Sequence, residues 1–385
     1  MRQEKSRAIV IPFIGGKDVM PITGYFGPYP HDYEGFPDYF TDDIFKKIAD
    51  AGINLIVRSA ADYHTQPELV EKTLSLGEKY GVGIFVSDNS IVEGEGAQTI
   101  TAEVAAKKME NYIDRKALCG MYVTDEPTAT YYCDPDGSRL ISKYERASKV
   151  LQQDLDQLCY SNLLPVYNFE PETRSNYERY VNEFCDTLQP KVISWDMYPF
   201  DKHREGKMEV YFYNMDVIRK AADERNLPFW AFIQAGAQWN DGWNEFEVTT
   251  PYFPNEEQFH WNVNTSLAFG AQGIQYFPLV QPYQFTLTKD GDYECNGIIG
   301  AMGTAVLQVP RTSRRILHMM AKNRQIIWRL CSVHSATCRN GSVCIGGNGT
   351  VHRPEQFIRE ILPETAVFQS QENQLLMYLK TGVIN

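Results

Sequence analysis

The regular alternation of short apolar runs with amphipathic stretches constrains the fold of this chain more than any other feature of its sequence. Eight apolar runs have the length and composition of buried strands, and each is followed by a stretch with helical periodicity. The predicted strands cover residues 20–25, 53–57, 82–86, 120–123, 164–167, 192–195, 229–233 and 273–277. Eight strand–helix units in succession are the number that closes a parallel barrel, so the sequence predicts an α/β fold, the TIM (β/α)₈ barrel.

The predicted helices carry recognisable start and stop signals. Thr41 stands before two acidic residues as the expected N-cap of the first helix, and Gly52 is expected to end it. The other helices are predicted over residues 67–80, 101–116, 138–158, 171–188, 207–225, 255–269 and 296–320. The first strand is not followed by a glycine-rich dinucleotide fingerprint, which argues against an open doubly wound sheet.

The periodic pattern stops near residue 322. The segment that follows is rich in cysteine and glycine and has no clear period, and short apolar runs return only near the end of the chain. We therefore predict a catalytic barrel domain over residues 1–322 and a C-terminal tail over 323–385, either irregular or an incomplete β domain.

Composition narrows the classes of partner. The formal net charge of −12 argues against a nucleic-acid partner, because nothing would neutralise the phosphates, and it suits a neutral substrate. The sequence contains no run of about 18 apolar residues, so it does not predict a membrane span. The eight cysteines lack Cys-x-x-Cys spacing, which favours reduced thiols in a cytoplasmic protein over disulfides or a zinc site. A homodimer is one expectation for a barrel of this size.

The ends of the predicted strands carry hydrogen-bonding side chains. Catalytic groups of (β/α)₈ barrels come from the C-terminal ends of strands and the loops that follow. These positions hold Tyr25, Arg58, Asp88, Asn89, Asp125, Glu126, Asn168, Asp196, Tyr198, Gln234, Gln275 and Tyr276. The set contains neither His nor Cys, which argues against a metallohydrolase, and no glycine-rich loop with a Lys indicates phosphoryl transfer. We expect proton transfer on a hydroxyl-rich substrate, without a cofactor.

The segment from Gly120 to Pro127 holds the sharpest catalytic signal. An apolar strand runs directly into Asp125 and Glu126, and a proline follows. Two like charges in a partly dry cleft raise the pKa of at least one carboxyl, as a general acid requires. The alternative is that the two acids only begin a turn and cap the next helix.

Two further segments provide candidate substrate contacts. Asp196 and Tyr198 follow an apolar strand and share one side by the two-residue period, although Asp196 could instead hold its loop by accepting backbone N–H groups. After the seventh strand, Trp239 and Trp243 are candidates for a sugar platform or for packing at the barrel rim.

Three of these segments resemble the clan of retaining barrel glycosidases that includes the β-galactosidases. They are Tyr-Val-Thr-Asp-Glu-Pro after strand four, Ile-Ser-Trp-Asp-Met-Tyr-Pro-Phe after strand six, and the stretch from Asn255 into strand eight. The resemblance spans about residues 20 to 320. It implies a glycoside hydrolase whose acid/base is Glu126. From their positions at the strand ends and in the loop after strand seven, we also expect substrate contacts from Tyr25, Arg58, Asn168, Tyr198, Gln234, Trp239, Trp243 and Tyr276.

The chain departs from that clan at two positions. The clan has Asn before its acid/base, where this chain has Asp125, and its nucleophile is a Glu ending strand seven, where this chain has Gln234. An amide cannot form the glycosyl ester. The second catalytic group is therefore open: Asp196, Glu245 or Glu247 as nucleophile, or inversion with Asp196 activating water.

Two other functions stay open at this point. An adjacent Asp-Glu pair resembles that of barrel hexosaminidases, in which the 2-acetamido group of the substrate attacks; Asp125 would orient that group and Glu126 would protonate the leaving oxygen. The amide at Gln234 also fits a non-catalytic carbohydrate-binding barrel.

Overall fold

The structure is a computed structural model, and it describes residues 9–16, 19–28, 39–58, 61–127, 143–166, 171–200, 207–235, 254, 256–279, 281–287, 293–296, 344–345 and 351–352. Backbone contacts divide the chain into two compact units. The first comprises residues 1–267 and 271–315, and the second comprises 268–270 and 316–385. In the second unit, the structure describes a two-stranded ladder of β11 (Cys344–Ile345) and β12 (Val351–His352). The last residue of α10, Ala268, also belongs to this unit. The domain boundary at residue 322 stays a prediction.

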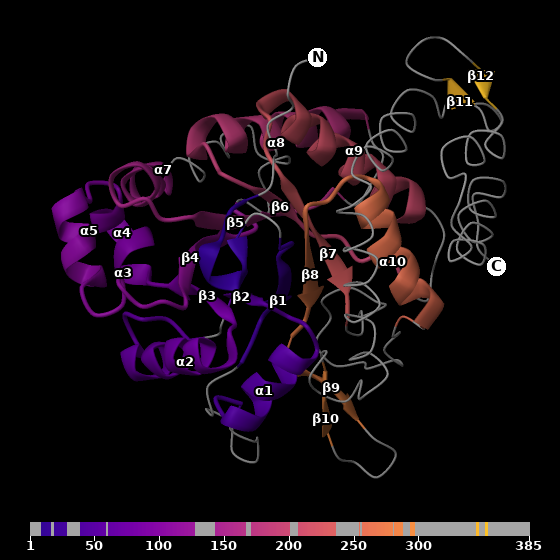
Figure 1. The fold of residues 1–385 in the computed structure, drawn as a ribbon. Coiled ribbons are helices and arrows are strands. Elements are labelled where there is room, and N and C mark those ends of the chain that lie inside the picture. Colours follow the sequence, from indigo (N-terminus) through magenta and orange to yellow (C-terminus); the bar gives the residue numbers. More distant parts are fainter. Residues whose placement is uncertain are drawn as a thin grey trace. The chain divides into compact units, whose positions relative to one another are not determined.

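The first unit contains a closed barrel of eight parallel strands in the order β1 to β8 (Figure 1). This arrangement confirms the predicted (β/α)₈ barrel. The strands are β1 (Ile22–Tyr25), β2 (Leu55–Arg58), β3 (Gly83–Ser87), β4 (Leu118–Asp125), β5 (Cys159–Leu163), β6 (Ile193–Trp195), β7 (Phe229–Gln234) and β8 (Gly273–Phe277). The ladder between β8 and β1 closes the barrel, with Thr23 opposite Gln275.

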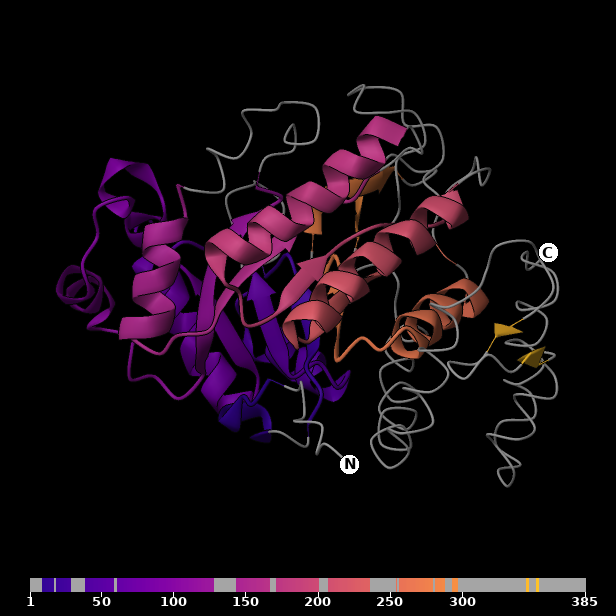
Figure 2. The same cartoon turned by 90° about the horizontal axis from the view of Figure 1, so that it is seen from above.

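Helices follow the strands and cover the outside of the barrel (Figure 1). They are α1 (Asp42–Asp50), α2 (Pro67–Tyr80), α3 (Asn89–Val92), α4 (Gly94–Ala97), α5 (Ala102–Met109), α7 (Glu145–Lys149) with the π-turn η3 (Val150–Asp154), α8 (Pro171–Leu188), α9 (Lys207–Arg225) and α10 (Glu256–Ala268). In Figure 2, α8, α9 and α10 run beside one another outside the second half of the barrel. Trp261 of α10 packs on Tyr211 and Phe212 of α9, which joins two of these helices.

The helix signals read from the sequence agree with the structure in detail. The Thr41 hydroxyl accepts a hydrogen bond from the Ile44 N–H at 3.4 Å, as an N-cap does. Gly52 follows α1 with φ of 88°, a conformation that glycine adopts without a steric cost. The predicted helix over 101–116 is shorter in the structure and ends at Met109.

The fifth strand is displaced from its predicted position. We predicted residues 164–167, but the strand runs from Cys159 to Leu163. Ser161 and Asn162 made this segment look too polar for a buried strand, although both are buried in the structure. The Asn162 amide is tolerated inside the barrel because it hydrogen-bonds with Asp125, Asp196 and Ser194. A two-stranded ladder of β9 (Gln281–Leu287) and β10 (Tyr293–Asn296) was not predicted at all, and its last residue lies where we predicted a helix to begin.

The interior of the barrel is filled mainly by aromatic side chains. Tyr25, Phe85, Tyr122, Tyr160 and Trp230 belong to one buried cluster, and their rings meet at centroid distances near 6 Å. The 3₁₀ turn η1 (Pro12–Ile14) and the residue before it add Ile11 and Ile14 to the same cluster. A packed interior leaves the C-terminal ends of the strands as the place for chemistry.

Candidate active site

The end of β4 carries Asp125 and Glu126 next to each other. Asp125 is the last residue of the strand and pairs with Asn162 of β5. Glu126 has φ of 42°, in the left-handed region that is uncommon for residues with a side chain, and its N–H donates to the Asn162 carbonyl at 2.8 Å. The two carboxyl groups reach different neighbours from this turn.

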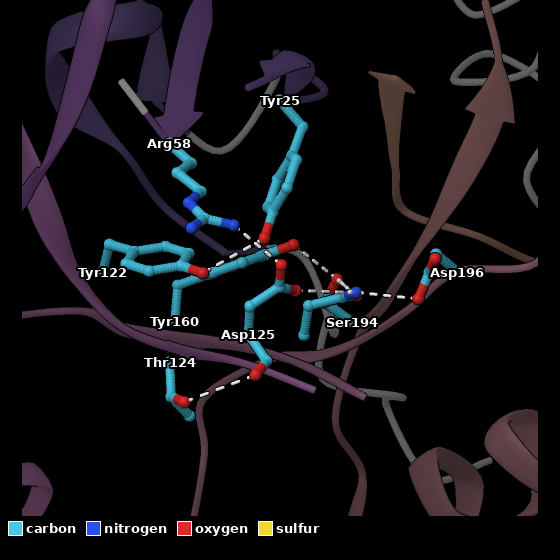
Figure 3. Close-up of polar contacts among 9 residues, drawn as sticks. Tyr25, Arg58, Tyr122, Thr124, Asp125, Tyr160, Ser194 and Asp196 are labelled. Carbon is cyan, nitrogen blue, oxygen red and sulfur yellow. Dashed lines mark hydrogen bonds and ion pairs between the residues drawn. The ribbon is translucent and has the colours of Figure 1, made fainter. Parts of the chain in front are cut away.

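The carboxylate of Asp125 is engaged by two donors. Its Oδ2 accepts a hydrogen bond from Arg58 Nη1 at 2.8 Å, and its Oδ1 accepts one from Asn162 Nδ2 at 3.3 Å (Figure 3). The ion pair with Arg58 is about one-third exposed, with side-chain values of 31% and 33%. Arg58 and Asn162 therefore hold the Asp125 carboxyl in place at the strand ends.

Aromatic rings hold the Arg58 guanidinium in place. Its central carbon lies 4.9 Å from the ring centroid of Phe26, 5.2 Å from that of Tyr122 and 5.9 Å from that of Tyr25. The hydroxyls of Tyr25 and Tyr122 are hydrogen-bonded at 3.1 Å. Tyr25, predicted as a substrate contact, is 2% exposed, and in the structure it supports Arg58.

Asp196 follows β6 and lies in contact with Glu126. Its Oδ1 accepts a hydrogen bond from Asn162 Nδ2 at 2.8 Å, and its carboxyl is also hydrogen-bonded to Tyr198 and to Glu126. Asp196 is only 5% exposed. Two carboxyl groups that share a hydrogen bond must hold at least one proton between them, because an ionised carboxylate is an acceptor only.

Burial raises the pKa of both members of this pair. For Glu126, burial acts together with the nearby charges of Asp196 and Asp125, while Arg58 opposes them. For Asp196, burial and the charge of Asp125 raise the pKa, whereas hydrogen bonds from Asn162, Tyr198 and Glu126 lower it. Glu126 is the member that holds its proton more strongly, because two neighbouring carboxyls oppose its ionisation, whereas three hydrogen bonds favour the ionised form of Asp196. The pair therefore consists of a weaker acid, Glu126, and a stronger acid, Asp196.

A cleft of about 420 Å³ opens over the ends of β2, β3 and β4, and Asp125 belongs to its lining, whereas Glu126 and Asp196 do not. It is lined by Phe26, Arg58, Ala61, Asp62, Ser87, Asn89, Glu93, Tyr122, Val123, Thr124, Asp125 and Tyr144. The lining holds one cationic side chain and three carboxylates, so its formal charge is −2 if all are ionised. Asp125 belongs both to this lining and to the hydrogen-bond network that reaches Asp196.

Gln234 is placed where it cannot act as predicted. Its side chain is fully buried, with Oε1 accepting from the Phe200 N–H at 3.1 Å and Nε2 donating to the Phe200 carbonyl at 2.9 Å. The amide therefore pairs with the main chain of Phe200 as a neighbouring strand would, and it holds the loop after β6 in place. Both polar ends are committed to the main chain, which corrects the expectation of a substrate contact.

Tyr276 also differs from its predicted role. It is fully buried, and its ring stacks on Phe259 of α10 at 5.6 Å with an interplanar angle of 9°. Its neighbour Gln275 faces the interior, where Tyr160 donates to its Oε1 at 2.8 Å. Successive side chains of a strand point to opposite faces, so Tyr276 is a contact between the barrel and its helices.

Tyr198 is at the site, and the remaining predicted residues lie outside the described part of the chain. Tyr198 bonds to Asp196, and its ring stacks on Phe277 at 5.2 Å. The residues that the structure does not describe are Asn168, Trp239, Trp243, Glu245 and Glu247.

Asn162 and Tyr122 are the residues of the site that the sequence analysis missed. Asn162 was assigned to the loop before the misplaced fifth strand. Tyr122 precedes the acidic pair by three residues and read as part of an apolar strand. A two-residue period beginning at Tyr160 would have placed Asn162 on the inner face.

Within the described ranges, no three His, Cys, Asp or Glu side chains are grouped so that they could hold a metal ion. No helix in the described part of the chain has the length and apolar character that crossing a bilayer requires.

Comparisons with known proteins give the fold. No family of known sequences matches the chain, and no curated protein sequence does either. Among solved structures, the chain is similar to a β-galactosidase from Rahnella sp. R3 at 12% identity, over 82% of this chain and 58% of the other, with a TM-score of 0.54. It is also similar to a β-galactosidase from G. stearothermophilus at 13% identity, over 79% and 57%, with a TM-score of 0.52.

A third similar structure is the β-glucuronidase of Bifidobacterium dentium, at 12% identity over 77% of this chain and 46% of the other, with a TM-score of 0.50. The chain thus spans about half of the length of these three proteins. At these identities the likeness concerns the architecture, and the chain shares with these glycosidases an eight-stranded parallel barrel.

Proposed function

We propose that this protein is a glycoside hydrolase in which Glu126 is the general acid/base and Asp196 is the second catalytic carboxylate. The observation that carries the proposal is the hydrogen-bonded Glu126–Asp196 pair at the ends of β4 and β6. Paired carboxyls whose pKa values are pushed apart are the chemical equipment of glycosidases.

The short separation favours a double displacement. Retaining enzymes hold their two carboxyls about 5–5.5 Å apart, whereas inverting enzymes need about 6.5–9.5 Å to admit a water molecule. A direct hydrogen bond between the carboxyls is shorter than both ranges and leaves no room between them for the water of an inverting mechanism. Glu126 would protonate the glycosidic oxygen as an Asp196 oxygen bonds to the anomeric carbon. Glu126 would then take a proton from the water that displaces Asp196.

The same pair argues against the substrate-assisted alternative. That mechanism needs no carboxylate opposite the acid, but Asp196 lies against Glu126. It also needs Asp125 to orient an acetamido group, but Asp125 is bound by Arg58 and Asn162. A thiazoline analogue that leaves the rate unchanged would agree with the two-carboxylate mechanism.

The cleft favours a neutral substrate. The lining holds Arg58, which is ion-paired with Asp125, and the two further carboxylates of Asp62 and Glu93, so we expect the cleft to repel a uronate or a sugar phosphate. Aromatic rings of Phe26, Tyr122 and Tyr144 belong to the same lining and supply apolar faces for sugar C–H groups. We therefore propose glycosides without an anionic substituent.

The decisive experiment compares Glu126→Gln with the wild type on aryl glycosides of graded leaving-group ability. We expect loss of about 10³-fold or more on poor leaving groups and a much smaller loss on activated ones, because only poor leaving groups need the proton. Glu103→Gln, an exposed Glu of α5, is the matched control and should keep full activity. Equal losses on all leaving groups would contradict the role of Glu126. Saturable sugar binding without any product would point to a non-catalytic barrel.

A further inference from the structure

Asn162 contacts all three acidic residues at the strand ends. One amide nitrogen, Nδ2, lies 2.8 Å from Asp196 Oδ1 and 3.3 Å from Asp125 Oδ1, and the main-chain carbonyl accepts the Glu126 N–H at 2.8 Å. The side chain is 2% exposed, and its amide nitrogen is bonded to two carboxylates. Asn162 is therefore placed to act on the carboxylates.

A hydrogen bond from Ser194 fixes the orientation of the Asn162 amide. Its Oδ1 accepts a hydrogen bond from the Ser194 hydroxyl at 3.0 Å. Ser194 in turn accepts one from Gln275 Nε2 at 2.8 Å, and Tyr160 donates to Gln275 Oε1 at 2.8 Å. Burial keeps the pKa of Tyr160 well above its ordinary value, so its hydroxyl stays a donor. Because Oδ1 of Asn162 accepts from Ser194, Nδ2 is the end of the amide that faces the carboxylates.

The charged and titratable groups that face Asp196 come from three described elements. Glu126 and Asp125 follow from β4, Tyr198 lies on the same segment as Asp196, and Arg58 of β2 acts through its ion pair with Asp125. The charge of Asp125 opposes ionisation of Asp196, whereas the hydrogen bonds from Glu126 and Tyr198 favour it. Asn162 is a neutral donor that favours it, and it also takes part of the charge of Asp125.

We infer that Asn162 is a positioning residue that makes Asp196 the ionised member of the Glu126–Asp196 pair, so that the shared proton resides on Glu126. This inference rests on the proposed function for its catalytic meaning, but its physical content concerns only the location of one proton. In the glycosidase, Asn162 would assign the role of acid to Glu126 and the role of base or nucleophile to Asp196.

The test is a carboxyl ¹³C NMR titration of the full-length protein, with Asp196 assigned by its absence in Asp196→Asn. In Asn162→Ala we expect the pKa of Asp196 to rise by about one pH unit relative to wild type, the size of one hydrogen bond to a charged group. Ser194→Ala should produce a smaller rise in the same direction, because the amide loses its anchor. This second variant keeps the test open if Asn162→Ala fails to fold.

The control is Asn54→Ala, which removes another buried amide. Asn54 bonds to the main chain of Met20 and Ile22, before the first strand and at its start, so its loss should lower stability and leave the Asp196 titration unchanged. An Asp196 pKa that is the same in wild type, Asn162→Ala and Ser194→Ala would overturn the inference. The titration needs no substrate, so it stands apart from the outcome of the hydrolysis assays. If hydrolysis is observed, the acid limb of the kcat/KM profile should move with the titration.

Discussion

The ends of β4 and β7 differ in what holds their polar side chains. At β4, Glu126 sits on a backbone of positive φ, and its carboxyl faces another carboxyl. At β7, Gln234 is fully buried, and both ends of its amide bond to the main chain of Phe200. At the end of β4, neighbouring carboxyls oppose the ionisation of Glu126. At the end of β7, both ends of the Gln234 amide have hydrogen-bond partners. The carboxyl that Glu126 faces therefore lies at the end of β6, and the side chain at the end of β7 holds the main chain of Phe200.

Asp196→Asn should break this comparison most strongly. An amide cannot attack the anomeric carbon or accept the proton of Glu126, so we expect kcat to fall by about 10³-fold, or about 4 kcal/mol. Thermal unfolding should change little, because the Oδ1 of the new Asn can still accept from Asn162 Nδ2 and its NH2 can donate to the Glu126 carboxylate. Azide should restore turnover in Asp196→Gly by taking the place of the carboxylate. An Asp196→Asn enzyme with wild-type kcat would remove Asp196 from the mechanism.

Gln234→Ala should show the opposite behaviour. It leaves the N–H and the carbonyl of Phe200 without their side-chain partners in a buried site, and we expect a loss of about 2–3 kcal/mol in the free energy of unfolding. Activity per folded molecule should stay within about tenfold, or 1.4 kcal/mol. Urea unfolding and active-site titration measure the two quantities separately. A Gln234→Glu variant that hydrolyses faster than wild type would show that the end of β7 takes part in catalysis.

The pH dependence of kcat/KM tests whether Glu126 and Asp196 share a proton at the ends of β4 and β6. The active form holds one proton on the pair, so activity is lost when pH falls through the pKa of Asp196 and when it rises through the pKa of Glu126. Both pKa values are raised, mainly by burial, so the whole window lies above that of ordinary carboxyls near pH 4. At pH 4.5 we expect at least about a tenfold loss from the optimum. Full activity at pH 4.5 in the folded protein would contradict the crowded pair.

The smallest effect concerns stability. Because the pKa of Glu126 is raised by folding, its contribution to stability is present below its ordinary pKa and is lost as pH rises through the folded value. A Gln at this position does not ionise and escapes that loss. We expect Glu126→Gln to melt about 2 °C higher than wild type at pH 8, roughly 1 kcal/mol, with little difference at pH 4. A melting-point difference that does not vary between these pH values would argue against the crowding.

Local periodicity was sufficient to predict most of the barrel. Helices α2, α8 and α9 and strand β8 have the predicted bounds, because their apolar spacing is regular and their ends carry proline, glycine or a polar break. The strand β5 was misplaced because it contains two buried polar residues, Ser161 and Asn162, of which Asn162 belongs to the hydrogen-bond network inside the barrel. Such a strand looks like a loop until its neighbours across the barrel are known.

Residues of the candidate site could be predicted only where an acidic residue directly follows a recognisable apolar strand. Glu126 and Asp125 were found because two acids end an apolar strand, and Asp196 was found for the same reason. The buried state of Gln234 and Tyr276 depends on partners in other segments, Phe200 and Phe259, which single-strand patterns do not contain. The role of Asn162 depends on three contacts between strands and has no local signal.

The backbone at residue 126 has a consequence for engineering this protein. A φ of 42° suits glycine or asparagine better than glutamate, and the buried, crowded carboxyl adds a second cost there. Any selection for thermostability alone, in the laboratory or by automated sequence design, will therefore tend to replace the acid. A library built on this scaffold should hold Glu126 fixed and seek its added stability elsewhere.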